Sequence, residues 1–176
     1  MTGMQAAAEL LAALAAALVL RTWVLSLACI RGHSMMDTLR DREWAFVWRL
    51  TYLFRAPRRH EVVICHYPGR NWKRCKWVPQ SFVKRVVGLP GDTVEFRDGV
   101  LYINDAPLDE PYLNPARARF MGNRAPVTLG EDEYYVLGDH RDRSSDSRRV
   151  GPIRRRAIRG RVLCVFWPLT SIRPIR

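Results

Sequence analysis

The sequence predicts a mainly β fold, in which a single N-terminal transmembrane helix precedes a β-rich domain of antiparallel sheets. Two features carry this prediction. Residues 4–20 are almost wholly apolar and rich in alanine, as expected of a helix that enters a membrane. After them, short runs of β-branched and aromatic residues alternate with turn residues, which is typical of an antiparallel β fold. We therefore divide the chain into an anchor (residues 1–22) and a β domain (residues 23–176).

The apolar segment is short for a membrane span, which needs roughly 17–25 residues. Glu9 is its one charged residue before Arg21, whose side chain can extend to the interface, where Trp23 would also be favoured. A soluble packing helix and a cleaved signal peptide are the alternatives. No Lys or Arg precedes the segment, whereas Arg21, Arg31 and Arg40 follow it. The positive-inside rule alone would therefore place the β domain in the cytoplasm.

Strands are predicted along the rest of the chain from their β-branched, aromatic or alternating residues. The Asp98-Gly99 pair lies between two such runs and predicts a hairpin. Residues 114–127 carry few periodic signals, and we expect an irregular excursion there. The predicted strands are residues 61–65, 81–87, 93–97, 100–104, 133–137 and 161–166.

The composition limits the classes of partner. The chain has 176 residues, enough for one domain and an anchor, and a formal net charge of +12. Such a charge attracts nucleic acid or an anionic membrane surface. The sequence has no zinc-finger spacing, no aromatic RNA-binding motif and no basic helix followed by heptads, so we expect a lipid bilayer and no nucleic acid as partner.

Two cysteines flank a loop and leave alternatives open. Cys65 and Cys75 would form a disulfide only outside the cytoplasm, and the sequence does not fix their Cα geometry. A zinc site built from these cysteines and His66 lacks a fourth ligand, so no metal is predicted. Cys164 lies in an apolar run and is expected to be a small buried residue.

Ser34 and Lys84 are the candidate nucleophile and base. A serine hydroxyl is a weak nucleophile unless a base takes its proton. His33 is adjacent to Ser34, and neighbouring residues on an extended segment point in opposite directions. A triad that uses His66 or His140 has no familiar sequence context but stays an alternative. Lys84 lies in the run FVKRVV, whose apolar residues favour burial. Burial disfavours the ammonium and lowers the pKa of a lysine from about 10.4.

Three blocks of the sequence resemble the bacterial type I signal peptidases, the leader peptidase family that also includes the mitochondrial inner-membrane peptidases. The blocks are GHSM at residues 32–35, KRVVGLPGD at 84–92 and GDHRDRSSDSR at 138–148. The resemblance covers nearly the whole chain, and the EPYL run at residues 110–113 is similar to Gram-positive-type members. It implies a catalytic domain of coiled antiparallel sheets with its active site near the membrane surface.

The resemblance also implies roles for individual residues. Ser34 would be the nucleophile and Lys84 the general base, with the oxyanion held by the Ser34 backbone N–H. Ser144 would hydrogen-bond the lysine, and Asp146 and Arg148 would form a supporting ion pair. No metal and no organic cofactor are implied. The preprotein would bind as an added strand, with small side chains at positions −1 and −3 entering apolar pockets lined by Ile30, Met35, Leu39, Phe82 and Val83.

The chain departs from the family pattern at three positions. Gly32 stands where some relatives have a serine whose hydroxyl helps to hold the oxyanion. Asp37 stands where proline is more common, which could loosen the turn after the nucleophile. His140 replaces an asparagine, and because both side chains can hydrogen-bond locally we expect activity to survive.

The predicted function is that of a membrane-bound serine endopeptidase that removes N-terminal signal peptides from exported preproteins. It would be a single-pass protein of the plasma membrane with its catalytic domain on the extracytoplasmic face, because large domains translocate with little regard to charge. A self-cleaving repressor-type Ser/Lys protease is an alternative that would carry a DNA-binding module in front. An inactive membrane-anchored β domain that scaffolds secretion is the other, and the intact Ser34, Lys84 and Ser144 argue against it.

Overall fold

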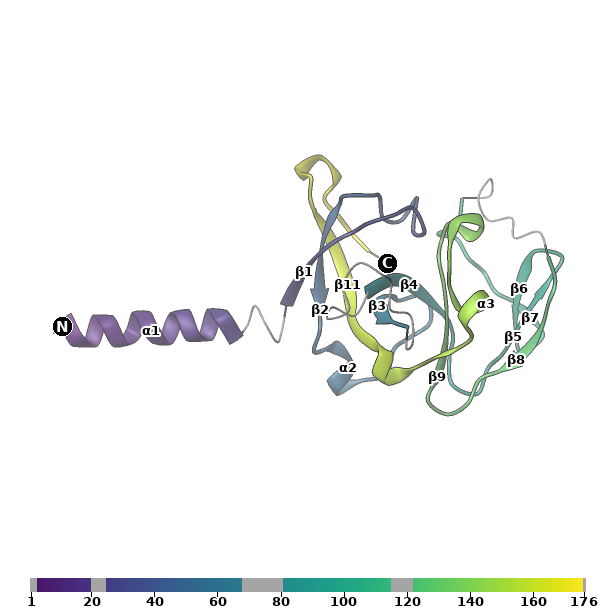
Figure 1. Cartoon of the computed structure of the whole chain (residues 1–176), viewed down its shortest axis with the longest axis horizontal. Coiled ribbons are helices and arrows are strands. Elements are labelled where there is room, and N and C mark those ends of the chain that lie inside the picture. The colour runs from purple at the N-terminus through teal and green to yellow at the C-terminus, as the bar shows by residue number, and fades with distance from the viewer. Residues whose placement is uncertain (1–2, 20–24, 68–80, 115–121, 176) are drawn as a thin grey trace.

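The computed structural model describes residues 3–19, 25–67, 81–114 and 122–175. A helix, α1 (Gly3–Val19), precedes a domain built from two antiparallel sheets. Figure 1 shows the two sheets side by side, with β4 and β9 leading from the first to the second. The prediction of a mainly β fold with antiparallel sheets is confirmed.

The first sheet has eight strands and is strongly curled. Its long strand β11 (Ile158–Trp167) pairs with β3 near its start and with β2 further along, and register shifts interrupt both ladders. Such bulges bend a strand and let a sheet curl. The order of strands is β1 (Leu25–Cys29), β2 (Trp44–Trp48), β11, β3 (Val62–His66), β4 (Ser81–Gly88), β9 (Glu133–Leu137) and β10 (Ile153–Arg154), with β12 (Arg173–Pro174) beside β11.

The second sheet has four strands, in the order β7 (Ala106–Pro107), β6 (Val100–Ile103), β5 (Thr93–Arg97) and β8 (Arg124–Thr128). Asp98 and Gly99 join β5 to β6 with φ angles of 49° and 84°, as a tight hairpin requires. Gly88, at the end of β4, allows the sheets to approach, because a methyl group there would lie 2.8 Å from Leu129, Val94 and Tyr135.

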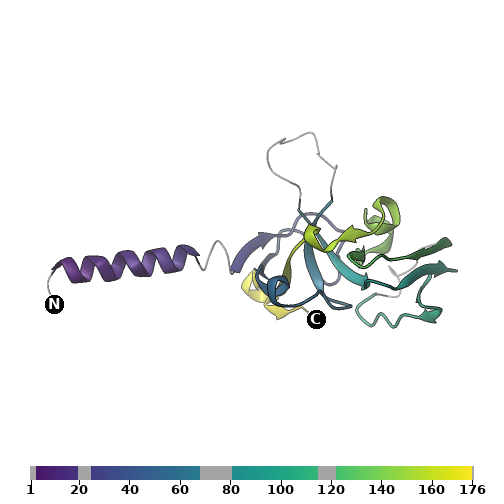
Figure 2. The same ribbon diagram turned by 90° about the horizontal axis from the view of Figure 1, so that it is seen from below.

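Short helices complete the domain. The α-helical turns are α2 (Thr51–Phe54) and α3 (Ser147–Val150), and the 3₁₀ turns are η2 (Arg141–Arg143), η3 (Arg155–Ala157) and η4 (Leu169–Ser171). Figure 2 shows α2 at the end of the first sheet where β1 begins.

The N-terminal helix has 17 residues, so the predicted helix is confirmed. Its span across a membrane is not, because no helix within the described ranges is both long and apolar enough to cross one. Arg21 and Trp23, on which the sequence argument placed the membrane boundary, lie outside the described residues.

Two predictions about strands need correction. The prediction that residues 114–127 are irregular is wrong for its last part, because β8 pairs with β5. β8 is an edge strand and mostly exposed, so it lacks the apolar alternation that marks a half-buried strand, and an edge tolerates its Pro126. The sequence analysis also missed β1 and β2, which follow the apolar segment without a clear turn signal.

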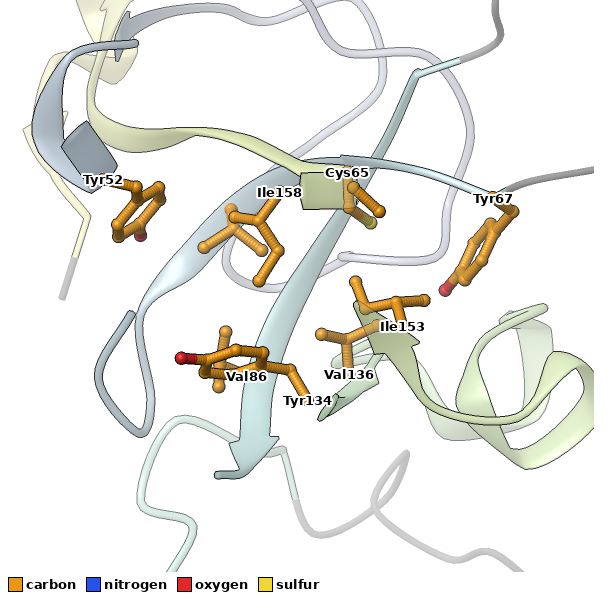
Figure 3. Close-up of a cluster of buried hydrophobic side chains, with 10 residues drawn as sticks. Tyr52, Cys65, Tyr67, Val86, Tyr134, Val136, Ile153 and Ile158 are labelled. Carbon is orange, nitrogen blue, oxygen red and sulfur yellow. The ribbon is translucent and has the colours of Figure 1, made fainter. Parts of the chain in front are cut away.

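Buried side chains form three clusters. One, shown in Figure 3, gathers Val63, Cys65, Val86 and Val136 on one face of the first sheet. A second lies on the other face of the sheet and includes Ile30, Met35, Leu39, Val47 and Val62. A third fills the space between the sheets around Val94, Phe96, Leu101 and Leu137. The candidate active site lies where β4 separates the first two clusters.

Candidate active site

Ser34 and Lys84, which lie 50 residues apart in the sequence, meet in the fold. Lys84 Nζ donates a hydrogen bond of 2.7 Å to Ser34 Oγ. Ser34 lies in the turn that follows β1, and Lys84 lies in the middle of β4, paired with Val63 of β3. A hydroxyl and an amine at this distance can exchange a proton directly.

Lys84 is only 2% exposed. Its burial lowers the pKa of the amine and Arg148 acts to lower it further, while the carboxylates of Asp146 and Asp139 act to raise it. Burial also raises the pKa of the neighbouring Cys65 thiol to about 12. That thiol is therefore neutral at physiological pH, and it gives the lysine no permanent counter-charge.

The loop after β9 is fitted closely against the Ser34 turn. The His140 backbone N–H donates to the Ser34 carbonyl oxygen at 3.1 Å. A methyl group on Gly138 would lie 2.5 Å from that oxygen and from Ser144 Cβ. Only glycine fits at this position, which explains the first residue of the GDHR block.

Asp146 and Arg148 form a buried ion pair under this loop. Asp146 is 0% exposed, and it accepts hydrogen bonds of 2.8 Å from both Nε and Nη2 of Arg148 and one of 3.0 Å from the Gly138 backbone N–H. Burial acts to raise the pKa of Asp146, but these hydrogen bonds and the charge of Arg148 outweigh it and lower the pKa. The pair thus holds the Gly138 loop in place.

Ser144 is buried in the same wall. Its hydroxyl lies close enough to Asp146 to help lower the pKa of that carboxyl, but it does not reach hydrogen-bonding geometry with any side chain that the structure describes. The hydrogen bond from Ser144 to Lys84 that the resemblance implies is therefore not made in this conformation.

A second buried ion pair, which the sequence analysis did not anticipate, lies on the opposite face of β4. Arg85, 1% exposed, donates to Asp139 through Nε at 3.0 Å and Nη2 at 2.8 Å. Thr38, four residues after Ser34, donates to the same carboxylate. The guanidinium also stacks on Tyr112, 3.8 Å from the ring centre. This network joins the Ser34 turn, β4 and the Gly138 loop.

A third ion pair extends the network. Arg141 donates to Glu110 at 2.9 Å and through a second, shorter hydrogen bond, and its Nε donates to the Gly138 carbonyl oxygen at 3.2 Å. Asp139 and Arg141 lie in the GDHR block, where the resemblance to the family implies only a structural role for them. The partner of Asp139 is Arg85, in the KRVVGLPGD block, and the partner of Arg141 is Glu110, in the EPYL run. These two runs are the sequence signal that could have identified the ion pairs.

The apolar residues predicted to line the substrate pockets divide between two faces of β4. Ile30, Met35 and Leu39 pack together with Val83 on one face. Phe82 points to the other face, where its ring lies 4.9 Å from that of Tyr67. These residues thus border the dyad from two sides.

The three departures are visible in the structure. Gly32 has a φ of 96° and donates its N–H to Asp41 at 2.7 Å. Asp37 has a φ of 85°, which proline, fixed near about −65°, cannot adopt, so the turn after Ser34 differs from one that contains proline there. His140 contacts Ser34 through its backbone, and its Nδ1 has no hydrogen-bond partner in the described part of the chain.

The alternative sites gain no support. The base beside Ser34 Oγ is Lys84 rather than a histidine. No three metal-binding side chains gather among the residues that the structure describes. Cys65 is a buried free thiol, and its proposed partner Cys75 lies outside the described residues.

A groove of about 360 Å³ runs along β1. One wall is β1, and the other includes Ile64, His66 and Ser81 from β3 and β4. β1 is the last strand of its sheet, and β4 pairs with β9 only from Arg85 onward. Both walls therefore offer strand edges to an extended peptide.

Comparisons with known proteins agree with this geometry. Residues 4–167 match the family model described as "Signal peptidase, peptidase S26". The "Signal peptidase I" of Bacillus licheniformis is 35% identical, over 89% of this chain and 84% of that protein. The "Signal peptidase I" of Leptolyngbya laminosa is 34% identical, over 89% of this chain and 75% of that protein. The "Signal peptidase I" of Bacillus amyloliquefaciens is also 34% identical, over 95% of this chain and 89% of that protein. The chain belongs to the signal peptidase family, peptidase S26.

Proposed function

We propose that this protein is a signal peptidase I, a serine endopeptidase that removes N-terminal signal peptides from exported preproteins with Ser34 as nucleophile and Lys84 as general base. The observation that carries the proposal is the hydrogen bond of 2.7 Å between Lys84 Nζ and Ser34 Oγ, made by a lysine whose burial lowers its pKa. A buried neutral amine is a base that can act near neutral pH.

In the proposed reaction the neutral amine of Lys84 takes the proton of the Ser34 hydroxyl as Oγ attacks the carbonyl carbon of the scissile peptide bond. The ammonium then gives this proton to the leaving amine, and the bond to the mature protein breaks. Lys84, neutral again, takes a proton from the water that attacks the ester carbon, and returns this proton to Ser34 Oγ as the bond to the signal peptide breaks. The Ser34 backbone N–H would stabilise the oxyanion, and the glycine at position 32 adds no hydroxyl.

The supporting residues would act through position rather than chemistry. Asp146 and Arg148 hold the Gly138 loop against the Ser34 turn. Ser144 lies in that loop, and a rotation of its hydroxyl toward Lys84 would orient the amine when substrate binds.

The substrate would bind as an added strand in the groove between β1 and β4. The free strand edges on both sides of the groove support this mode, because a peptide backbone can hydrogen-bond to each. Ile30, Met35, Leu39 and Val83 would form the apolar pocket nearest the nucleophile, with Phe82 at its border, which suits small side chains such as alanine. The contact between Lys84 and Ser34 argues against the alternative of an inactive scaffold.

We further propose that residues 1–22 anchor the protein in the plasma membrane, with residues 23–176 on its extracytoplasmic side. Besides the apolar helix, one face of β1 and β2 supports this placement. Leu27, Trp44 and Trp48 are exposed on this face, and Trp167 of β11 pairs with Trp44 there. Exposed aromatic residues of this kind favour the membrane interface.

The test is cleavage of a model preprotein with an Ala-x-Ala site by the full chain in detergent, beside Ser34→Ala and Lys84→Ala. We expect cleavage after this site by the wild type and none by either variant. A folded wild type that leaves the preprotein intact would contradict the proposed function, and cleavage by Lys84→Ala would contradict the dyad.

A further inference from the structure

A second cavity, separate from the dyad, lies at the end of the first sheet. It has a volume of about 830 Å³ and lies between α2, η3 and the turn before β9. Its apolar floor includes Leu50, Tyr52 and Ile158. Leu50, Tyr52 and Ile158 take no part in the proposed peptidase reaction, whereas Arg49 and Arg159 of this cavity also line the far end of the groove along β1.

The rim of this cavity is basic. Arg49, Arg155, Arg156 and Arg159 line it, opposed by the single carboxylate of Asp132, so four positive charges face one negative charge. Within the described ranges, no ion pair joins Arg156 or Arg159 to a carboxylate. A cavity with this excess of cations is complementary to an anion.

One of the arginines is held in a fixed orientation. Arg155 Nη2 donates to the carbonyl oxygens of Tyr52 at 2.9 Å and Arg55 at 3.3 Å. Its backbone N–H donates to the Asp132 carbonyl oxygen at 3.0 Å. These bonds connect η3 to α2 and to the turn before β9, so a ligand would meet at least one arginine whose position is already fixed.

Two large apolar side chains project beside the rim. Leu53 is 72% exposed and Phe54 is 83% exposed. The neighbouring face of the sheet carries the exposed Trp48, which directly precedes Arg49 in the chain. A basic cavity bordered by exposed apolar side chains suits an amphiphile with a negatively charged head group better than a free phosphate or a nucleic acid.

The strand register places this cavity near the N-terminal segment. Trp48 pairs with Leu25, the first residue of β1, and α1 ends at Val19. Arg49 and α2 therefore lie at the end of the sheet where the chain arrives from the apolar helix, as Figure 2 shows for α2 and β1.

From these observations we infer that the cavity binds the phosphate head group of an anionic phospholipid in the bilayer, with Leu53 and Phe54 inserted among the acyl chains. The inference rests on the proposed membrane anchoring. It assigns to the arginines a role distinct from catalysis, which is to fix the height and tilt of the β domain over the membrane so that the groove along β1 faces emerging signal peptides.

The test places a photoreactive benzophenone amino acid at Phe54 of the full chain. The protein is reconstituted in vesicles of phosphatidylglycerol and phosphatidylcholine and irradiated. In one sample the phosphatidylglycerol is radiolabelled, and in the other the phosphatidylcholine is. We expect phosphatidylglycerol to be captured about fivefold or more above its share of the bilayer, because each cation at an anionic surface contributes about 1 kcal/mol. Charge reversal in Arg156→Glu should abolish the enrichment.

Matched controls make the result specific. Arg149→Glu changes the charge equally on α3, outside the cavity, and should keep the enrichment. The same photoreactive group at Val100, which is exposed on the second sheet, should capture little lipid. Thermal melts of each variant check folding, and cleavage of a soluble Ala-x-Ala peptide in detergent reports on the dyad independently.

The other outcomes overturn the inference. Capture of the two lipids in their bulk ratio would exclude a head-group site, and equal losses in Arg156→Glu and Arg149→Glu would exclude this cavity. If the chain fails to float with the vesicles, the membrane proposal fails as well, whereas active protein in vesicles without lipid capture at Phe54 refutes the head-group site alone.

Discussion

Replacing Lys84 with methionine separates the catalytic role of the amine from the cost of burying it. Methionine is similar in length and uncharged, so it can fill the same space among Val63, Cys65 and Val86. We expect Lys84→Met to cleave no preprotein and yet to be more stable than the wild type at neutral pH. The reason is that the wild type must bury an amine that is charged when unfolded.

The size of this effect depends on pH in a defined way. Burial depresses the pKa of Lys84 in the folded state, whereas in the unfolded state the pKa is about 10.4. Between these two values the unfolded chain binds more protons than the folded one, so the stability of the wild type rises with pH by about 1.4 kcal/mol per unit. Below the pKa of Lys84 in the folded state, the lysine is protonated in both the folded and the unfolded chain. In that range the difference in unfolding free energy between the wild type and Lys84→Met does not change with pH.

Urea unfolding of the full chain, repeated across the neutral and alkaline range, measures this dependence. Ser34→Ala is the matched control, because it is inactive but retains the buried lysine and should keep the pH dependence of the wild type. In the wild type, kcat/KM should rise with pH through the same depressed pKa, since the neutral amine is the active form. A stability difference between wild type and Lys84→Met that does not change with pH would refute the reasoning.

Two further substitutions test the scaffold around the dyad. Gly138→Ala should lower kcat/KM strongly and destabilise the fold by about 1–3 kcal/mol, because the new methyl would overlap Ser144. Gly130→Ala, whose methyl would lie 3.5 Å from the nearest atom, is the control, and equal effects of the two would contradict this explanation. Asp139→Ala should cost about 3–5 kcal/mol in urea unfolding by leaving Arg85 buried without its partner, and a loss below 1 kcal/mol would show that the pair is not needed.

Much of the fold and the centre of the site could be predicted from local sequence. The strands at residues 93–97 and 133–137 match β5 and β9 residue for residue. β5 alternates because only one of its faces is buried, whereas β9 is aromatic and apolar because both of its faces are buried. Lys84 was predicted to be buried because its neighbours are apolar, and it is. Local pattern is informative wherever a segment has one face in the core.

Other features could not be predicted, because they depend on pairing across the sheet or on loops. β8 is an exposed edge strand and carries no apolar period. The network around Arg85 joins Asp139, Thr38 and Tyr112, which are distant in sequence and whose types are common on protein surfaces. Only their contacts with Arg85 distinguish them, and these contacts follow from the tertiary fold.

The adjacent residues Lys84 and Arg85 show two solutions to one physical problem, which is how to bury a cation. They point to opposite faces of β4. Arginine cannot lose its proton in a protein, so Arg85 needs the carboxylate of Asp139. Lysine can lose its proton, so an apolar environment turns Lys84 into a base.

The same reasoning gives the Asp146–Arg148 pair an electrostatic role. An unpaired Asp146 would stabilise the ammonium of Lys84 and keep it protonated, since its charge acts to raise the pKa of the lysine. Arg148 acts in the opposite direction and is bonded to that carboxylate. The ion pair therefore allows the Asp146 carboxylate to hold the Gly138 loop without cancelling the lowering of the Lys84 pKa by burial. An arginine placed at position 84 would remain charged and could not serve as base.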